Sequence, residues 1–248
     1  LDGATGGCFA VLTERWNQLL FGFQYPTDQY WRPTLAFVLL FVAFAPVMFF
    51  KLPRNLLIFT AVYPFLGYWL IWGGSIWVSV FAASGFVAGY MVYRQFITNS
   101  FAVAFFGAIV GAFLFWWIAG FITPVLVNLI PVGLEVVESR QVGGFMLNMI
   151  LGVVCLSLAL PLGIVLALGR QSSMPIIKWI CVVFIEFVRG VPLITLLFVA
   201  NVVLAYFLPP EANFDLVVRV IIMITLFAAA YIAEVIRGGL AALPTGQY

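Results

Sequence analysis

Charged residues are scarce in this chain of 248 residues: they make up 8% of it, against about 25% in an ordinary soluble domain, whose surface must stay wet. Histidine is missing, and three cysteines are too few for a disulfide framework or a Cys/His metal site. The net charge of +2 includes no basic block, which argues against nucleic acid as a partner. Neither a GxxxxGK nucleotide loop nor a GxSxG elbow occurs. We therefore expect neither catalysis nor a metal or cofactor on this chain.

Apolar residues are abundant instead. They make up 65% of the chain, and the mean hydropathy is +1.18. Runs of about twenty apolar residues recur, which is the length that an α-helix needs to cross about 30 Å of hydrocarbon, whereas strands of a membrane barrel alternate apolar and polar residues over about ten. The sequence predicts an all-α integral membrane protein, built as a multi-span helical bundle.

The apolar runs between charges predict seven crossings. They are Thr34–Phe50, Asn55–Gly73, Ser75–Tyr93, Phe101–Pro124, Val142–Gly169, a part of Ile176–Leu208, and Leu216–Ile236. One alternate set of loops contains only cations: Lys51, Arg54, Arg94, Arg170, Lys178 and Arg237. Short cytoplasmic loops are enriched in Lys and Arg, so we predict the N-terminus of this chain outside and its C-terminus in the cytoplasm.

The segment Ile176–Leu208 is 33 residues long, about 50 Å as one helix, which is too long for a single span without a steep tilt. It should break at Gly190–Pro192, because proline lacks an N–H and clashes with the preceding turn, while glycine relaxes the backbone. We predict a helix on the cytoplasmic side over Ile176–Arg189 and a crossing over Val191–Leu208.

Glu186 and Arg189 lie just before that break, three residues apart and so on one helical face, where they can pair. A charge at the bilayer centre costs about 2.5 to 3.5 kcal/mol, so both need a partner, an aqueous cavity or an interfacial position. Two interpretations stay open. The pair either fixes the helix break as an interfacial anchor, or lines a gate or substrate path together with Gly190 and Pro192.

Glu234 and Arg237 repeat this spacing near the end of the last apolar run. Here an anchor role is favoured, because a cation normally marks the cytoplasmic end of a helix, and Gly238–Gly239 can terminate it. The following LAALPTGQY, with Pro244 and Gly246, is typical of the approach to a cytoplasmic loop.

The stretch Glu138–Tyr248 resembles the permease subunit of ATP-binding-cassette (ABC) importers for polar amino acids. The resemblance is carried by ESRQVGGFMLN, LPLGIVLALGRQS, FIEFVRGVPLITLLF and AAYIAEVIRGGLAALPTGQY, over about 110 of the 248 residues. It is greatest to the branch that handles general L-amino acids, or glutamate, glutamine, aspartate and asparagine. The four candidates from Glu186 to Pro192 fall on the family motif before the pore-side helix, and those from Glu234 to Gly246 on the approach to the ATPase-coupling loop.

This resemblance implies a subunit that moves polar L-amino acids across the bacterial inner membrane. It also implies a second permease subunit, a cytoplasmic ABC ATPase dimer that holds the ATP and Mg, and a periplasmic amino-acid-binding protein. An EAA coupling loop normally follows, and Leu1 is neither a methionine nor the start of a signal sequence, so we expect this sequence to be a fragment that lacks both ends.

Three regions are expected on this basis. Residues 1–33 form an extracytoplasmic interfacial segment, residues 34–131 an N-terminal region of about four spans, and residues 138–248 the first three or so spans of a type-1 importer permease core. Within them, residues 75–131 depart from the branch and contain two apparent extra crossings. The rival hypotheses are a self-contained ion-coupled carrier or channel, which should show intramembrane carboxylates and related halves, and a structural subunit without a transport path.

Overall fold

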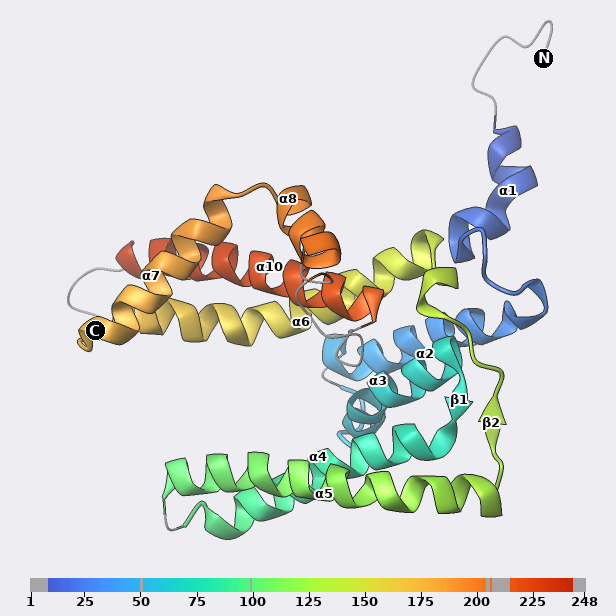
Figure 1. The fold of residues 1–248 in the computed structure, drawn as a ribbon, viewed down its shortest axis with the longest axis horizontal. Helices are drawn as coiled ribbons and strands as arrows, with labels where there is room; N and C mark the ends of the chain where they lie inside the picture. The colour runs from blue at the N-terminus through green and yellow to red at the C-terminus, as the bar shows by residue number, and fades with distance from the viewer. Residues whose placement is uncertain (1–8, 50, 99, 204–205, 207–214, 243–248) are drawn as a thin grey trace, which may run out of the picture. The chain divides into compact units, whose positions relative to one another are not determined.

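The computed structural model describes residues 9–49, 51–98, 100–203, 206 and 215–242, and most of them are helical. The α-helices are α1 Ala10–Phe21, α2 Trp31–Met48, α3 Leu56–Trp72, α4 Ile76–Phe96, α5 Phe101–Leu129, α6 Gly144–Arg170, α7 Pro175–Gly190, α8 Leu193–Phe198 and α10 Leu216–Ala241 (Figure 1). Short 3-10 turns occupy Thr27–Gln29 and Ser139–Gln141, and a π-helical turn occupies Val199–Val203. The predicted all-α fold is confirmed, with one two-residue antiparallel pairing of β1 Gly74–Ser75 and β2 Gly133–Leu134.

Five of the described helices are long and apolar enough to cross a membrane, so the chain is a multi-pass membrane protein. They are α2 with its preceding turn, α4, α5, α6 and α10. A sixth crossing results if α7 and the segment Leu193–Val203, which meet at 103°, form one broken span. Helix α3 is apolar but has only 17 residues, so the predicted crossing at Asn55–Gly73 stays a prediction.

The break between α7 and α8 is where the sequence predicts it. Helix α7 ends at Gly190, Val191 is extended, and Pro192 is the N-cap of α8. Proline cannot donate the N–H that would continue α7, and its ring restricts Val191 to extended geometry. The start of helix α10 is also set by neighbouring residues. Asp215 is its N-cap, and the Asp215 carboxylate accepts a hydrogen bond from the Val217 N–H at 2.9 Å.

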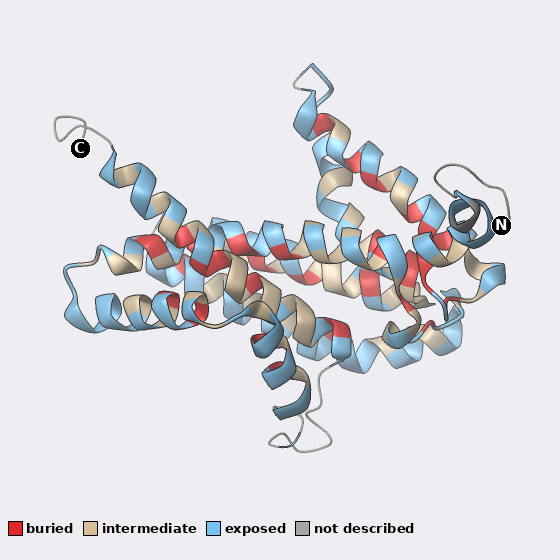
Figure 2. Ribbon diagram, turned by 90° about the horizontal axis from the view of Figure 1, so that it is seen from above, coloured by how far each residue is buried: buried red, intermediate tan, exposed pale blue. Residues whose placement is uncertain are grey.

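The chain divides into two compact units: residues 25–141 form one, and residues 1–24 with 142–248 form the other. In both, only narrow stripes of the helices are buried (Figure 2), and many large apolar side chains are exposed. Exposed aromatic residues are especially frequent along α5, where Phe106, Phe113, Trp117 and Phe121 are each more than 60% exposed. An apolar exterior is what a helix bundle presents to lipid.

The unit of residues 25–141 is held together at one end by Arg32, whose side chain is completely buried. Its Nε donates to the Leu70 carbonyl at 2.8 Å, and its Nη1 donates to the Glu135 carbonyl at 2.9 Å. Close by, the Tyr25 hydroxyl donates to the Ile71 carbonyl at 3.1 Å. Burial raises the pKa of this phenol, and the Arg32 charge opposes the shift. Arg32 thus satisfies carbonyls at the end of α3 and joins that end to the segment after β2.

Helices α4 and α5 pack side by side in the same unit. A Cβ atom added at Gly85 would lie 1.8 Å from Nε1 of Trp116, the atom that donates to the Ala82 carbonyl at 3.2 Å. Glycine is required here because the indole lies directly against the helix backbone.

We therefore expect Gly85→Ala to destabilise the α4–α5 pair by about 1 to 3 kcal/mol through overpacking. The matched control is Gly120→Ala on α5, where an added Cβ meets nothing within 4 Å. Melting temperatures of the purified protein in detergent should fall for Gly85→Ala only. Equal melting temperatures for the two variants would contradict the close approach of Trp116.

In the other unit, α6 and α10 pack closely because small residues face each other. Ala159, Ala229 and Ala233 are fully buried, and a Cβ at Gly163 would lie 2.6 Å from Cγ2 of Ile232. Helix α7 packs on both of these helices, with a buried cluster of Ala167, Ile185 and Ala233 at the junction. The last turns of α6 and α7 are thereby brought beside the last third of α10.

Candidate functional site

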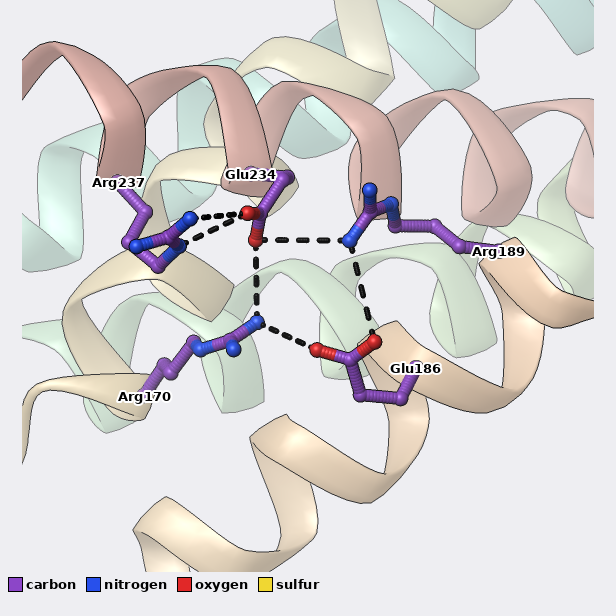
Figure 3. A network of polar contacts seen from close by, with 5 residues as sticks. All are labelled: Arg170, Glu186, Arg189, Glu234 and Arg237. Atoms are coloured by element: carbon purple, nitrogen blue, oxygen red, sulfur yellow. Dashed lines mark hydrogen bonds and ion pairs between the residues drawn. The ribbon is translucent and has the colours of Figure 1, made fainter.

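Five charged residues from three helices meet at this junction (Figure 3). Arg170 is the last residue of α6, Glu186 and Arg189 lie in the last turns of α7, and Glu234 and Arg237 lie in the last turns of α10. We call this group the ion ring. It combines both carboxylate–arginine pairs that the sequence predicts with Arg170, for which the sequence predicts only a place in a loop.

Glu234 is the shared acceptor of the ion ring. Its Oε2 lies 3.1 Å from Nη1 of Arg170 and 3.6 Å from Nη1 of Arg189. Its Oε1 accepts a hydrogen bond from Nε of Arg237 at 2.9 Å. One carboxylate therefore contacts three arginines, each on a different helix.

Glu186 closes the ring from the side of α7. Its Oε1 lies 3.0 Å from Nη1 of Arg170, and its Oε2 lies 3.9 Å from Nη1 of Arg189. Arg170, Glu186, Arg189 and Glu234 thus alternate in sign around a closed circuit, as the dashed lines in Figure 3 show. A network of this kind is worth more than separate exposed pairs, which contribute about 0 to 1 kcal/mol each.

The two carboxylates differ in exposure. The side chain of Glu234 is 21% exposed and that of Glu186 is 53% exposed. A more buried charge is less screened by solvent, and removing its partner leaves a larger uncompensated charge. Glu234 is therefore the position at which neutralisation should disturb the ring most.

Arg189 is held against α10 by a second contact. Its guanidinium carbon lies 5.6 Å from the centroid of the Tyr231 ring, which is within the range of a cation–π interaction. Just beyond it, Val188 and Leu196 share a buried cluster with Ala230. Both sides of the bend between α7 and α8 are thus packed against α10, next to the ion ring.

Gly190 and Pro192 form the bend itself, as predicted. The expectation that Gly238–Gly239 terminates the last helix is wrong, because α10 continues through both residues to Ala241. Neither glycine has the positive φ that ends a helix in the left-handed conformation. Pro244 and Gly246 lie outside the described residues.

The chemistry available to the ion ring is electrostatic. In the part of the chain that the structure describes, no group of three or more His, Cys, Asp or Glu residues could hold a metal ion. Both ring carboxylates are occupied by arginines, which do not exchange protons at physiological pH. Such an arrangement can hold helix ends together or release them, and it offers neither a nucleophile nor a general base.

No protein-family model matches the chain. It is 54% identical over 247 residues to the glutamate/glutamine/aspartate/asparagine transport system permease protein BztC of Rhodobacter capsulatus, a match that covers 99% of this chain and 57% of that protein. It is 36% identical over 246 residues to the inner membrane amino-acid ABC transporter permease protein YhdY of Escherichia coli, with 98% of this chain and 52% of that protein covered.

A solved crystal structure of an amino acid ABC transporter with histidines matches 39% of this chain and 44% of its own chain, at 29% identity and a TM-score of 0.37. The chain spans about half the length of the two curated relatives, 57% of one and 52% of the other. Both of those matches extend across residues 75–131, the region expected to depart from the branch. The assignment of this region to extra crossings stays a prediction.

Proposed function

We propose that this chain belongs to the permease family of amino-acid ABC transporters, to which it is similar, and that it is part of a subunit that carries polar L-amino acids across the bacterial inner membrane. The observation that carries the proposal is the 54% identity to a glutamate/glutamine/aspartate/asparagine permease over 99% of the chain. Those four amino acids are the proposed substrates.

Energy for uptake would come from outside this chain. We propose that a cytoplasmic ABC ATPase dimer binds the ATP and Mg, that a second permease subunit completes the path, and that a periplasmic binding protein delivers the amino acid. The name of the Escherichia coli relative, an ABC transporter permease protein, supports a separate ATPase. The distribution of Lys and Arg among the loops supports an outer N-terminus and a cytoplasmic end of α10 for this chain.

The ion ring then lies on the cytoplasmic side, between the bend and the approach to the ATPase-coupling loop. We propose that Gly190 and Pro192 form the hinge of a gate, with Glu186 and Arg189 at its edge. Glu234 and Arg237 sit on the helix that leads to the coupling loop. Contacts among these residues offer a physical connection between the loop and the gate.

Uptake by the reconstituted transporter tests this function. The complete gene product would be placed in proteoliposomes with its partner permease, ATPase and binding protein, and entry of radiolabelled glutamate would be followed. We expect uptake to require ATP on the ATPase side and to be competed by unlabelled glutamine, aspartate and asparagine, but not by leucine.

The control for the energy source is an ionophore that collapses ion gradients, which should leave ATP-driven uptake unchanged. Uptake that proceeds without ATP and stops with the ionophore would overturn the proposal in favour of an ion-coupled carrier. Competition by leucine alone would overturn the proposed substrate class.

A further inference from the structure

The ion ring contains two kinds of ion pair. Glu186 with Arg189, and Glu234 with Arg237, are pairs within one helix at a spacing of three residues. The remaining contacts, from Arg170 to both glutamates and from Arg189 to Glu234, join different helices. The first kind depends only on the helix that carries it, whereas the second kind exists only while the three helices are together.

Separation of α7 from α6 and α10 would therefore leave neither carboxylate alone. Glu186 would keep Arg189, and Glu234 would keep Arg237. An uncompensated charge near a membrane is the main obstacle to opening an ion network. In the ion ring this cost is small, because each carboxylate keeps an arginine partner on its own helix. The ring is therefore suited to open and close rather than to hold the three helices together permanently.

Arg170, unlike the other four residues of the ion ring, has no ion-pair partner on its own helix within the described part of the chain. Both of its ion-pair partners in the described part of the chain lie on other helices, at 3.0 Å on α7 and 3.1 Å on α10. Its pair with Glu186 joins α6 to α7 and would be lost when α7 separates, whereas its pair with Glu234 joins α6 to α10 and would remain. A group that interacts with only one of two states shifts the equilibrium between them by that interaction.

We propose that Arg170 is the positioning residue of a two-state latch, which in its closed state holds α7 against α6 and α10 and so sets the position of the bend at Gly190–Pro192. This inference rests on the proposed function, since the latch would control the gate of the transporter. Arg170 touches no substrate in this role. It acts through Glu186 and Glu234.

The chain contains its own reporter of the latch. Cys181 on α7 lies against the last turns of α6, where a Cβ at Gly169 would be 2.4 Å from its Sγ. Cys155 is buried, with only 1% exposed, and its Sγ contacts the Ile221 carbonyl on α10 at 3.7 Å. Movement of α7 away from α6 would uncover the Cys181 thiol and leave Cys155 covered.

The test is the rate at which a small maleimide modifies Cys181 in the complete, assembled transporter, with every other cysteine replaced. Arg170→Gln is expected to raise this rate about fivefold, because the ion pair that joins α6 to α7 is lost. Arg170→Lys, which keeps the charge, should stay near the parent rate. Lys178→Gln is the matched control, since it removes one positive charge from an exposed position on α7 outside the ring.

A second readout separates a latch from a merely structural contact. Modification of Cys181 in the parent protein should differ between the nucleotide-free and ATP-bound transporter, and Arg170→Gln should reduce that difference. If Arg170→Gln does not assemble, Glu186→Gln removes the α7 side of the latch and should raise the rate similarly. Parent-like rates in these variants, or an equal rise in Lys178→Gln, would overturn the latch.

The test does not depend on which solute is carried. A transporter that fails to take up polar amino acids would overturn the proposed function, and the ratio of modification rates between Arg170→Gln and the parent would still decide the latch. Conversely, normal uptake with unchanged Cys181 modification would overturn the latch alone.

Discussion

Under the proposed function, replacement of Glu234 by glutamine is expected to lower the initial rate of glutamate uptake about tenfold or more, at equal amounts of assembled transporter. Glu234 is the common partner of Arg170, Arg189 and Arg237. Without its charge, Arg170 and Arg189 keep only Glu186 as an ion-pair partner, and Arg237 loses the Glu234 pair. The mutual repulsion of the three arginines then acts in a partly buried place where solvent screens it weakly. The ends of α6 and α7 should then separate from α10.

Glu186→Gln is the matched control, because it makes the same chemical change in the same ring. Its carboxylate is 53% exposed and has two arginine partners rather than three. The rate should fall only about threefold, as expected for a more solvated charge. The measurement is the initial uptake rate of each variant, normalised to the amount of assembled complex, and the comparison shows which of the two carboxylates matters more for transport. An equal or larger loss for Glu186→Gln would contradict the shared-acceptor role of Glu234.

Replacement of Gly73 by alanine is expected to destabilise the unit of residues 25–141 by about 3 to 5 kcal/mol. A Cβ there would lie 2.1 Å from the Glu135 carbonyl oxygen and 2.6 Å from Nη2 of Arg32. Gly73 also has φ of 75°, in the left-handed region that disfavours a side chain. The substitution would force the buried Arg32 away from the carbonyls that it holds.

Gly74→Ala separates these two causes. Gly74 has a similar φ of 81°, but an added Cβ meets nothing within 4 Å. It should therefore show only the backbone cost, about 1 to 2 kcal/mol. Thermal unfolding in detergent and the yield of membrane-inserted protein measure the difference. Equal destabilisation by both substitutions would show that the clash with Arg32 and Glu135 is unimportant.

Several features of the site could be predicted from local sequence. The spacing of Glu186 and Arg189, and of Glu234 and Arg237, predicts pairs within a helix, and both pairs are present. Pro192 predicts the break after α7, because a residue without an N–H cannot continue the hydrogen-bond ladder. These predictions succeed because each depends on residues within one helical turn.

Other features were missed or misjudged. The run Gly238–Gly239 suggests a helix end, yet α10 continues to Ala241 because both residues keep negative φ. For Arg170 the sequence predicts only a place in a loop, although this residue donates a hydrogen bond to Glu234 across 64 positions of the chain. A positive charge near a helix end is so common in membrane proteins that the sequence offers no signal for this partner.

The sequence by itself determined that this is a helical membrane protein and which apolar runs form its helices, because hydrophobic length and residue spacing are local properties. The order of its motifs also carries the resemblance to amino-acid permeases. Only the tertiary structure decided that the two carboxylate–arginine pairs share Arg170, and that Arg32 is buried against a carbonyl 103 positions away. The physical reason is that such contacts depend on how α6, α7 and α10, or α2 and α3, pack, and packing is set by many small residues together rather than by any motif.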